Sequence, residues 1–146
     1  MAAGNYQGAY SADKVIMVVG GLTLSGGDDG DFVAAEYAED RATPKVGADG
    51  EVGISVNPSK LGTITFTFSA SSNANDQLSD LVAMDSTFGF RGSIPISVVD
   101  LSGRSVITAT KSWLQTAPAI TFGKEIGSRE WVFGCADLSL FAGGNN

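Results

Sequence analysis

The chain has 146 residues, 43% of them hydrophobic, and a formal net charge of -7 at pH 7. This length and apolar content are typical of a single domain that can bury a core. The acidity argues against binding to nucleic acid or to an anionic membrane, because both interactions need clustered Lys and Arg.

The chain also lacks most of the side chains used in catalysis. It has no His, and its one cysteine, Cys135, lies in an apolar run. Zinc ligation and His-dependent hydrolysis therefore have little support, and we expect Cys135 to be a buried apolar residue. We assign no catalytic residue, cofactor or metal ligand, and we expect no secretory signal or membrane span.

The first part of the chain is expected to hold an arm and a central strand. Residues 1–13 are small, polar and aromatic, and pack only where something covers Tyr6 and Tyr10. Residues 14–24 are almost continuously apolar, which predicts a strand covered on both faces, with a bend at its two consecutive glycines.

A glycine-rich acidic turn follows the first strand. Asp28, Asp29 and Asp31 resemble calcium ligands, but there is one copy of the pattern and no Glu at the required spacing. We therefore interpret it as a solvated turn. Residues 32–40 then predict a strand of mixed polarity.

Residues 41–57 predict a hairpin that projects from the body. Its tip contains a Gly-Ala-Asp-Gly turn, and its arms have few large apolar residues. A mobile surface loop and an assembly arm are both compatible with this pattern. The candidate arm residues, with the two N-terminal tyrosines, are Tyr6, Tyr10, Lys45, Val46, Gly47, Ala48, Asp49, Gly50 and Glu51.

The segment of residues 61–81 changes its hydrophobic period from two to about 3.6, which predicts a strand followed by a helix over residues 73–84. The strand alternates large apolar residues with hydroxyls, so its two faces differ in polarity. The hydroxyl face consists of Thr63, Thr65, Thr67 and Ser69. The apolar face of the helix consists of Leu78, Leu81 and Val82.

The last third predicts further antiparallel strands. Residues 93–100 and 105–110 predict a hairpin, and residues 111–118 a loop or single helical turn whose Trp113 covers the edge of the core. Two more strands are expected, over residues 119–126 and 129–140.

The predicted final strand changes parity along its length. Trp131, Phe133 and Cys135 alternate in one register and Leu138 and Leu140 in the other, so we expect a bulge near residues 134–136. Residues 142–146 are expected to form a loose tail. Taken together, the predicted elements make a mainly β, antiparallel β-sandwich or barrel-like subunit with one short flanking α-helix.

In this order and spacing, the motifs resemble those of the tail-tube proteins of contractile-tailed bacteriophages, the small myovirus tube family. The likeness covers most of the chain. The segments that carry it are YSADKV (10–15), GGDDGDF (26–32), VGADGEV (46–52), GTITFTFSASSNANDQLSDL (62–81), IPISVVD (94–100) and WLQTAP (113–118).

The resemblance implies a single tail-tube domain over residues 1–146, a structural protein and not an enzyme. It implies hexameric rings that stack into a tube conducting DNA inside a contractile sheath. In such a tube, the hydroxyl face of Thr63, Thr65, Thr67 and Ser69 is a candidate for the channel lining or a subunit interface, with a solvent-facing surface as the alternative. The implied partners are other copies of the chain and the sheath, tape-measure and baseplate proteins, with DNA as passing cargo and no membrane binding. The implied location is the virion, after assembly in the host cytoplasm.

Two alternatives remain at this point. Tube proteins of phage-like bacteriocins and secretion systems are similar and would carry no DNA. A carbohydrate-binding or small-ligand β-sandwich would instead be a monomer that exposes Trp113 or Trp131 as an aromatic platform.

Overall fold

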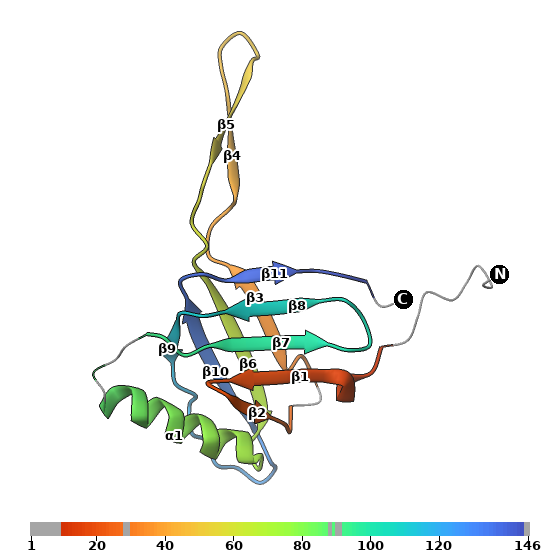
Figure 1. Cartoon of the computed structure of the whole chain (residues 1–146), viewed down its shortest axis with the longest axis vertical. Helices are drawn as coiled ribbons and strands as arrows, with labels where there is room; N and C mark the ends of the chain where they lie inside the picture. The colour runs from red at the N-terminus through yellow and green to blue at the C-terminus, as the bar shows by residue number, and fades with distance from the viewer. Residues whose placement is uncertain (1–9, 28–29, 88, 90–91, 145–146) are drawn as a thin grey trace, which may run out of the picture.

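The computed structural model describes residues 10–27, 30–87, 89 and 92–144, and it is mainly antiparallel β with one α-helix (Figure 1). This confirms the predicted fold class. One sheet has five strands in the order β11 (Ser139–Phe141), β8 (Val106–Ala109), β7 (Ile96–Asp100), β1 (Val15–Val19) and β2 (Leu22–Leu24). A second sheet has four strands in the order β3 (Val33–Tyr37), β6 (Gly62–Ser69), β10 (Ser128–Cys135) and β9 (Ser112–Thr116).

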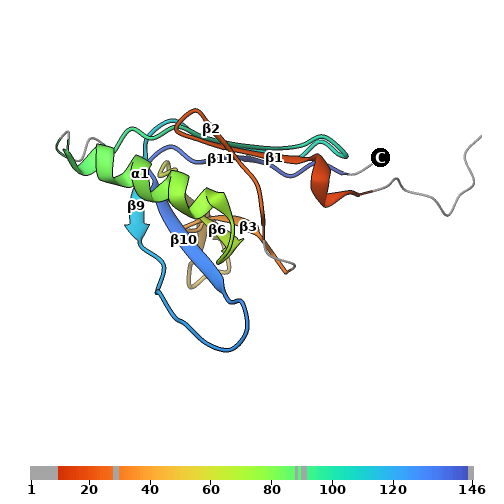
Figure 2. The same ribbon diagram turned by 90° about the horizontal axis from the view of Figure 1, so that it is seen from below.

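The two sheets pack face to face, and Figure 2 shows β1, β2 and β11 in one layer with β3, β6 and β10 in the other. Their facing side chains form the core, whose largest fully buried members are Phe66, Phe68 and Phe133. The Phe66 ring stacks on Phe68 at 6.0 Å and meets Phe133 edge-on at 5.9 Å. Burying each such ring contributes about 1.5–3 kcal/mol.

Helix α1 (Asn73–Thr87) flanks the sandwich and extends three residues beyond the predicted end. Its first turn begins at Ser72, whose hydroxyl oxygen accepts the Ala74 N–H at 3.1 Å, as an N-cap does. The same hydroxyl donates to the Ser25 carbonyl at 2.7 Å. The cap therefore also ties the helix to the loop after β2.

Residues 14–24 form a hairpin, β1 and β2, and not the single bent strand that we predicted. Gly20 and Gly21 have φ angles of 59° and 84°, the conformation that a tight type I′ turn requires at both central residues. A Cβ atom at Gly20 would lie 2.8 Å from the Leu81 side chain. Helix α1 thus packs directly on this turn, which leaves no room for a side chain.

Two connections, β8 to β9 and β10 to β11, cross between the sheets at one corner, which Asp137 holds together. Its carboxylate accepts the N–H groups of Thr110 at 3.1 Å and Lys111 at 3.0 Å, and the Thr110 hydroxyl as well. These bonds, that of the Thr110 hydroxyl foremost, hold the pKa of Asp137 below its ordinary value.

This corner explains the change of parity that we attributed to a bulge near residues 134–136. The strand ends at Cys135, and the chain crosses to the other sheet before Leu138 is buried again. A register shift does occur in β10, but between Val132 and Phe133, where it pairs with β9.

Three further segments differ from the sequence prediction. Residues 112–116, within the predicted loop or helical turn, form the strand β9, whereas residues 119–126, a predicted strand, form an exposed loop. The tail is bonded at Gly143, which exchanges two hydrogen bonds with the Ser105 hydroxyl. The Arg104 N–H also donates to the Gly144 carbonyl at 3.1 Å.

Candidate assembly surfaces

The hairpin of β4 (Ala42–Val46) and β5 (Val52–Val56) is a third, separate sheet that stands away from the sandwich (Figure 1). Every residue of both strands is exposed. Val46 is 65% exposed and Val56 72% exposed. An isolated two-stranded hairpin is marginally stable in water, and this one has four exposed aliphatic side chains, which makes it a candidate interaction surface.

The tip of the hairpin is well defined by its own hydrogen bonds. The Gly47 N–H donates to the Glu51 carbonyl at 2.8 Å, and the Gly50 N–H donates to the Gly47 carbonyl at 3.0 Å. The Glu51 N–H donates to a carboxylate oxygen of Asp49 at 3.2 Å. Of the predicted arm residues, Gly47, Ala48, Asp49, Gly50 and Glu51 thus form the turn, and Lys45 and Val46 end the strand β4 that leads into it.

The N-terminal arm residues lie elsewhere. Tyr10 is 57% exposed next to the one-turn 3₁₀ helix η1 (Ala12–Lys14), which leads directly into β1 of the five-stranded sheet. Tyr6 falls outside the described residues. The structure therefore does not bring Tyr10 together with the hairpin tip.

The predicted hydroxyl face lies on the outer side of the four-stranded sheet. Thr63, Thr65 and Thr67 point away from the core and are half-buried among their neighbours. Glu36 pairs with Thr63 and Glu130 with Thr67, so these carboxylates share the face. No Lys or Arg from the four strands lies there, because Arg129, the sheet's one strand cation, pairs with core-facing Phe68.

The remaining predicted residues are placed as follows. Ser69 ends β6, and its hydroxyl lies 3.1 Å from that of Ser71. Leu78 is fully buried, and Leu81 and Val82 pack against the core.

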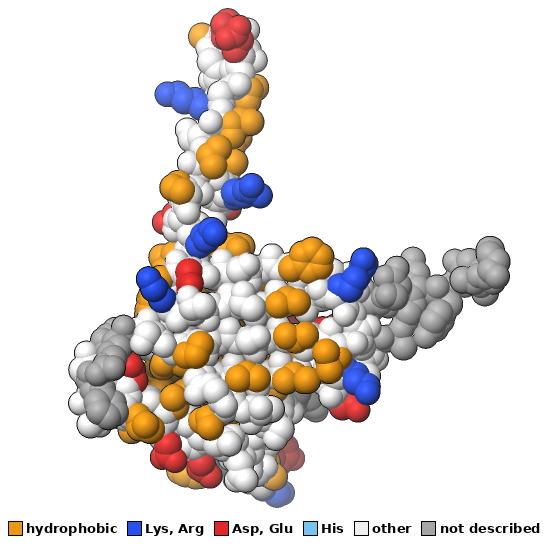
Figure 3. All heavy atoms as spheres, viewed as in Figure 1, with side chains coloured by type: hydrophobic (Ala, Val, Ile, Leu, Met, Phe, Trp, Pro, Cys, Tyr) orange, Lys and Arg blue, Asp and Glu red, His pale blue; other side chains and the backbone are white. Residues whose placement is uncertain are grey.

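The outer face of the five-stranded sheet is apolar and uncharged. Figure 3 shows hydrophobic side chains spread across this side of the body, with charged groups at its margins. The cross-strand pairs that share the face consist of Ile16, Val18, Thr23, Ser97, Val99, Val106, Thr108, Ser139 and Phe141.

Sequence reasoning missed a further surface, the loop of residues 117–127. Its Ile120, Phe122 and Ile126 side chains are largely exposed, and Phe122 is 89% exposed. The alternation of apolar residues in this segment is typical of a strand, but none of the strands in the described part of the chain pairs with it. The glycines at 123 and 127 were the available signal for a loop.

The two tryptophans are structural. Trp131 is buried and its indole N–H donates to the Asn75 side-chain oxygen at 3.0 Å. Trp113 lies over Gly134, where a Cβ would come within 2.8 Å of the indole. These placements favour a packing role for both tryptophans over a role as a sugar-stacking platform.

The one cysteine is free and lies in the core. Burial raises the pKa of the Cys135 thiol, which lies 3.4 Å from the Ser112 hydroxyl. Within the described part of the chain, no group of three or more His, Cys, Asp or Glu is placed to hold a metal ion. No helix among those residues is long and apolar enough to cross a membrane.

The fold is similar to that of chains in several solved structures. A chain in the virion of a native gene transfer agent superposes with a TM-score of 0.61 at 10% identity, covering 92% of this chain and 100% of that one. A chain in the tube-terminating cap of the anti-feeding prophage superposes with a TM-score of 0.59 at 11% identity. The match covers 97% of this chain and 95% of that one. A chain in the sheath-tube complex of an extracellular contractile injection system superposes with a TM-score of 0.53 at 12% identity. The match covers 92% of each chain.

Sequence comparison gives the family. Structural protein ORF10 of Pseudomonas phage KPP10 is 27% identical over 143 residues, which are 93% of this chain and 83% of the relative. The family model described as the bacteriophage PhiTE tail tube protein matches residues 10–143. The chain therefore belongs to the PhiTE tail tube protein family and is a structural protein of a phage tail.

Proposed function

We propose that this chain assembles into hexameric rings, that the rings stack into the tail tube of a phage, and that DNA passes through the central channel. The tube would lie inside a contractile sheath and contact the tape-measure and baseplate proteins. The chain would be made and assembled in the host cytoplasm and carry no catalytic residue.

The observation that carries this proposal is the bare hairpin. Four aliphatic side chains, Val46, Val52, Ile54 and Val56, are each more than 60% exposed on an element that touches little of its own body. Burial of apolar area contributes about 25 cal/mol per Å². Covering this hairpin with an adjacent subunit therefore stabilises both the arm and the assembly.

Exposed sheet edges give a second reason for closure. The edge strands are β2 and β11 in one sheet and β3 and β9 in the other. Unpaired edges are sites of uncontrolled aggregation, and closing copies of the chain into a ring covers them.

Charge supports a role in passing DNA. We assign the channel lining to the outer face of the four-stranded sheet, where Thr63, Thr65 and Thr67 lie among Glu36 and Glu130. A wall of hydroxyls and carboxylates releases no counterions from DNA and repels phosphates. DNA is then free to slide instead of binding.

Negative-stain electron microscopy of the purified protein tests the proposal. We expect rings and hollow rods of constant bore. A monodisperse monomer at high concentration, with no rods, would contradict the proposed tube.

Deletion of residues 47–50 tests the role of the hairpin. The tip contacts no part of the sandwich, so the shortened chain should keep its β-sheet circular dichroism and its thermal midpoint while forming no rods. Ala48→Ser, a change at the same tip that preserves its length, is the matched control and should assemble. Rods from the deleted chain would show that the hairpin is not an assembly arm.

A further inference from the structure

The hairpin and the 117–127 loop lie at opposite ends of the four-stranded sheet. The hairpin is joined where β3 meets β6, since the Ala38 N–H donates to the Leu61 carbonyl at 2.9 Å. The loop is joined at the far end of β6, where the Ala70 N–H donates to the Gly127 carbonyl at 3.0 Å. The eight residues of β6 separate the two ends by roughly 25 Å. Figure 1 shows the hairpin at the top of the molecule and this loop at the bottom.

The hairpin end is acidic and apolar. Asp49 and Glu51 flank its tip, which is red in Figure 3, and Val46 and Val52 lie next to them. One Asp49 oxygen already accepts the Glu51 N–H, whereas the Glu51 side chain is exposed. The tip thus offers carboxylates above an aliphatic collar.

The loop end is a pocket of about 330 Å³ with cations in its wall. Lys124, Arg129 and Glu125 contribute two positive charges and one negative, and Ser71 and Thr121 contribute hydroxyls. Phe122 lies beside the guanidinium of Arg129, with 5.9 Å between the Arg129 Cζ atom and the ring centroid.

Arg129 has an unmet hydrogen-bonding requirement. Its Nη1 atom is buried and has no hydrogen-bond partner among the described residues. A buried cationic donor without an acceptor is unfavourable, and a carboxylate is its strongest partner. The isolated subunit therefore has a site that an incoming carboxylate would complete.

We infer that the hairpin tip of one copy enters the 117–127 pocket of a copy in the next ring, with Glu51 accepting a hydrogen bond from Arg129. The aliphatic collar of the hairpin then covers Ile120 and Phe122 of the loop. Because the two surfaces are different and lie at opposite ends, the contact is head to tail and repeats along an axis. The inference rests on the proposed stacking of rings and names the surface that receives the arm.

Charge reversal tests the pairing, with the protein concentration at which rods appear as the readout. Glu51→Lys and Arg129→Glu should each raise that concentration on the order of tenfold or more, because each sets like charges against one another. The chain that carries both reversals should assemble within about threefold of the wild-type concentration, since it restores an opposite pair. Failure of the combined chain to recover, or wild-type assembly of both single variants, would overturn the inference.

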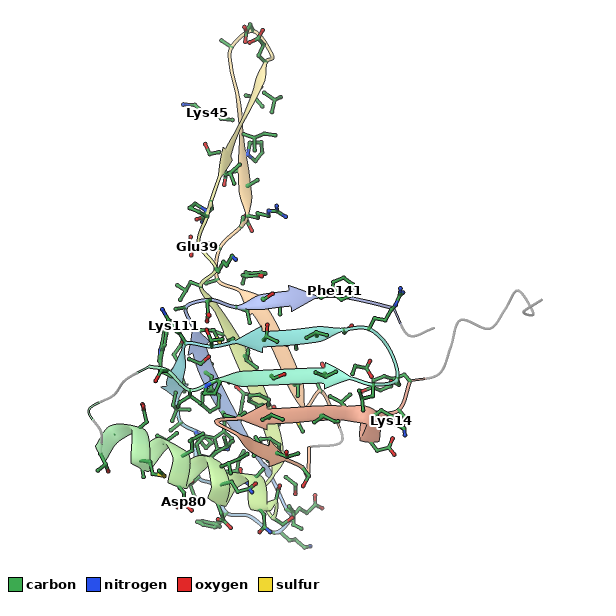
Figure 4. All side chains as sticks on the ribbon, in the orientation of Figure 1. Lys14, Glu39, Lys45, Asp80, Lys111 and Phe141 are labelled. Carbon is green, nitrogen blue, oxygen red and sulfur yellow. The ribbon has the colours of Figure 1, made fainter. Side chains whose placement is uncertain are left out.

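Folding and net charge are controlled separately. Thermal melts show whether Arg129→Glu folds, and Lys124→Glu on the exposed loop is a second receptor variant that should also impair assembly and be rescued by Glu51→Lys. Asp80→Lys and Lys111→Glu match the changes in charge but lie on neither the hairpin nor the loop (Figure 4). They should assemble as wild type does. If wild-type protein forms no rods, the proposed tube itself fails, whereas rods from every variant refute only this contact.

Discussion

At the scale of single residues, a few polar side chains form hydrogen bonds that connect loops and helix ends which the two sheets do not pair. Asp137 binds the two sheet-crossing connections, and Ser72 binds the helix start to the loop after β2. Gly134 acts by its lack of a side chain, because the indole of Trp113 occupies that space.

Asp137→Asn should destabilise the fold at neutral pH by about 1 kcal/mol, a value that allows for solvent screening of this partly exposed group. The folded-state pKa of Asp137 is lowered, so its contribution is present above pH about 4 and is lost as the pH falls through that lower pKa. Urea denaturation of the wild type and the variant measures the difference in the free energy of unfolding at pH 7 and at pH 3. The gap between wild type and variant should shrink at pH 3, and a gap that is equal at both pH values would contradict this assignment.

At the scale of elements, the Asn75 side chain links the first turn of helix α1 to β6 and β10. The Asn75 side chain donates to the carbonyls of Ser69 at 2.9 Å and Ser72 at 3.2 Å, and it accepts the Trp131 indole N–H. A helix with a weakly apolar face is thereby fixed against the end of β6. The β4–β5 hairpin, by contrast, is a separate two-stranded sheet, and we propose that a neighbouring subunit covers it.

Asn75→Ala should lower the free energy of unfolding by about 2 kcal/mol, because the buried Trp131 N–H loses its acceptor and two carbonyls lose a donor. Chemical denaturation followed by tryptophan fluorescence measures the loss. Asn73→Ala, the same change at an exposed position of the same helix turn, is the control and should cost less than about 0.5 kcal/mol. Equal losses in the two variants would show that Asn75 acts only through helix propensity.

At the scale of the whole molecule, the two outer faces differ in kind. One is apolar and uncharged, and the other combines hydroxyls with carboxylates. A ring must turn one face of each subunit toward its axis. The proposed channel uses the second face, because passing DNA favours a wall that repels phosphates.

Thr65→Cys tests that orientation, and the buried Cys135 gives little background. In assembled rods a small maleimide should label Cys at position 65, whereas a maleimide on a large polymer should not, because only the small reagent diffuses along the bore. In the unassembled subunit both reagents should react. If both maleimides label the rods equally, this face lies on the outside of the tube. If neither labels the rods, the face lies in a subunit interface.

Local pattern was enough to predict several elements. The alternation of Ile64, Phe66 and Phe68 predicted β6 and its buried face, and the Gly-Ala-Asp-Gly turn predicted the hairpin tip. Side-chain period and turn chemistry are properties of neighbouring residues, so the sequence alone determines them. The order of such motifs also indicated the tail-tube family, which the family model confirms.

Only the tertiary structure decided which segments find partners. The sequence predicts a strand over residues 119–126 and a loop or helical turn over residues 111–118, yet residues 112–116 pair with β10 and residues 119–126 form an exposed loop. The crossing at Asp137 and the pocket around Arg129 likewise join residues distant in sequence or from separate elements. Strand pairing and charge placement depend on contacts between distant segments, and a linear pattern does not contain those contacts.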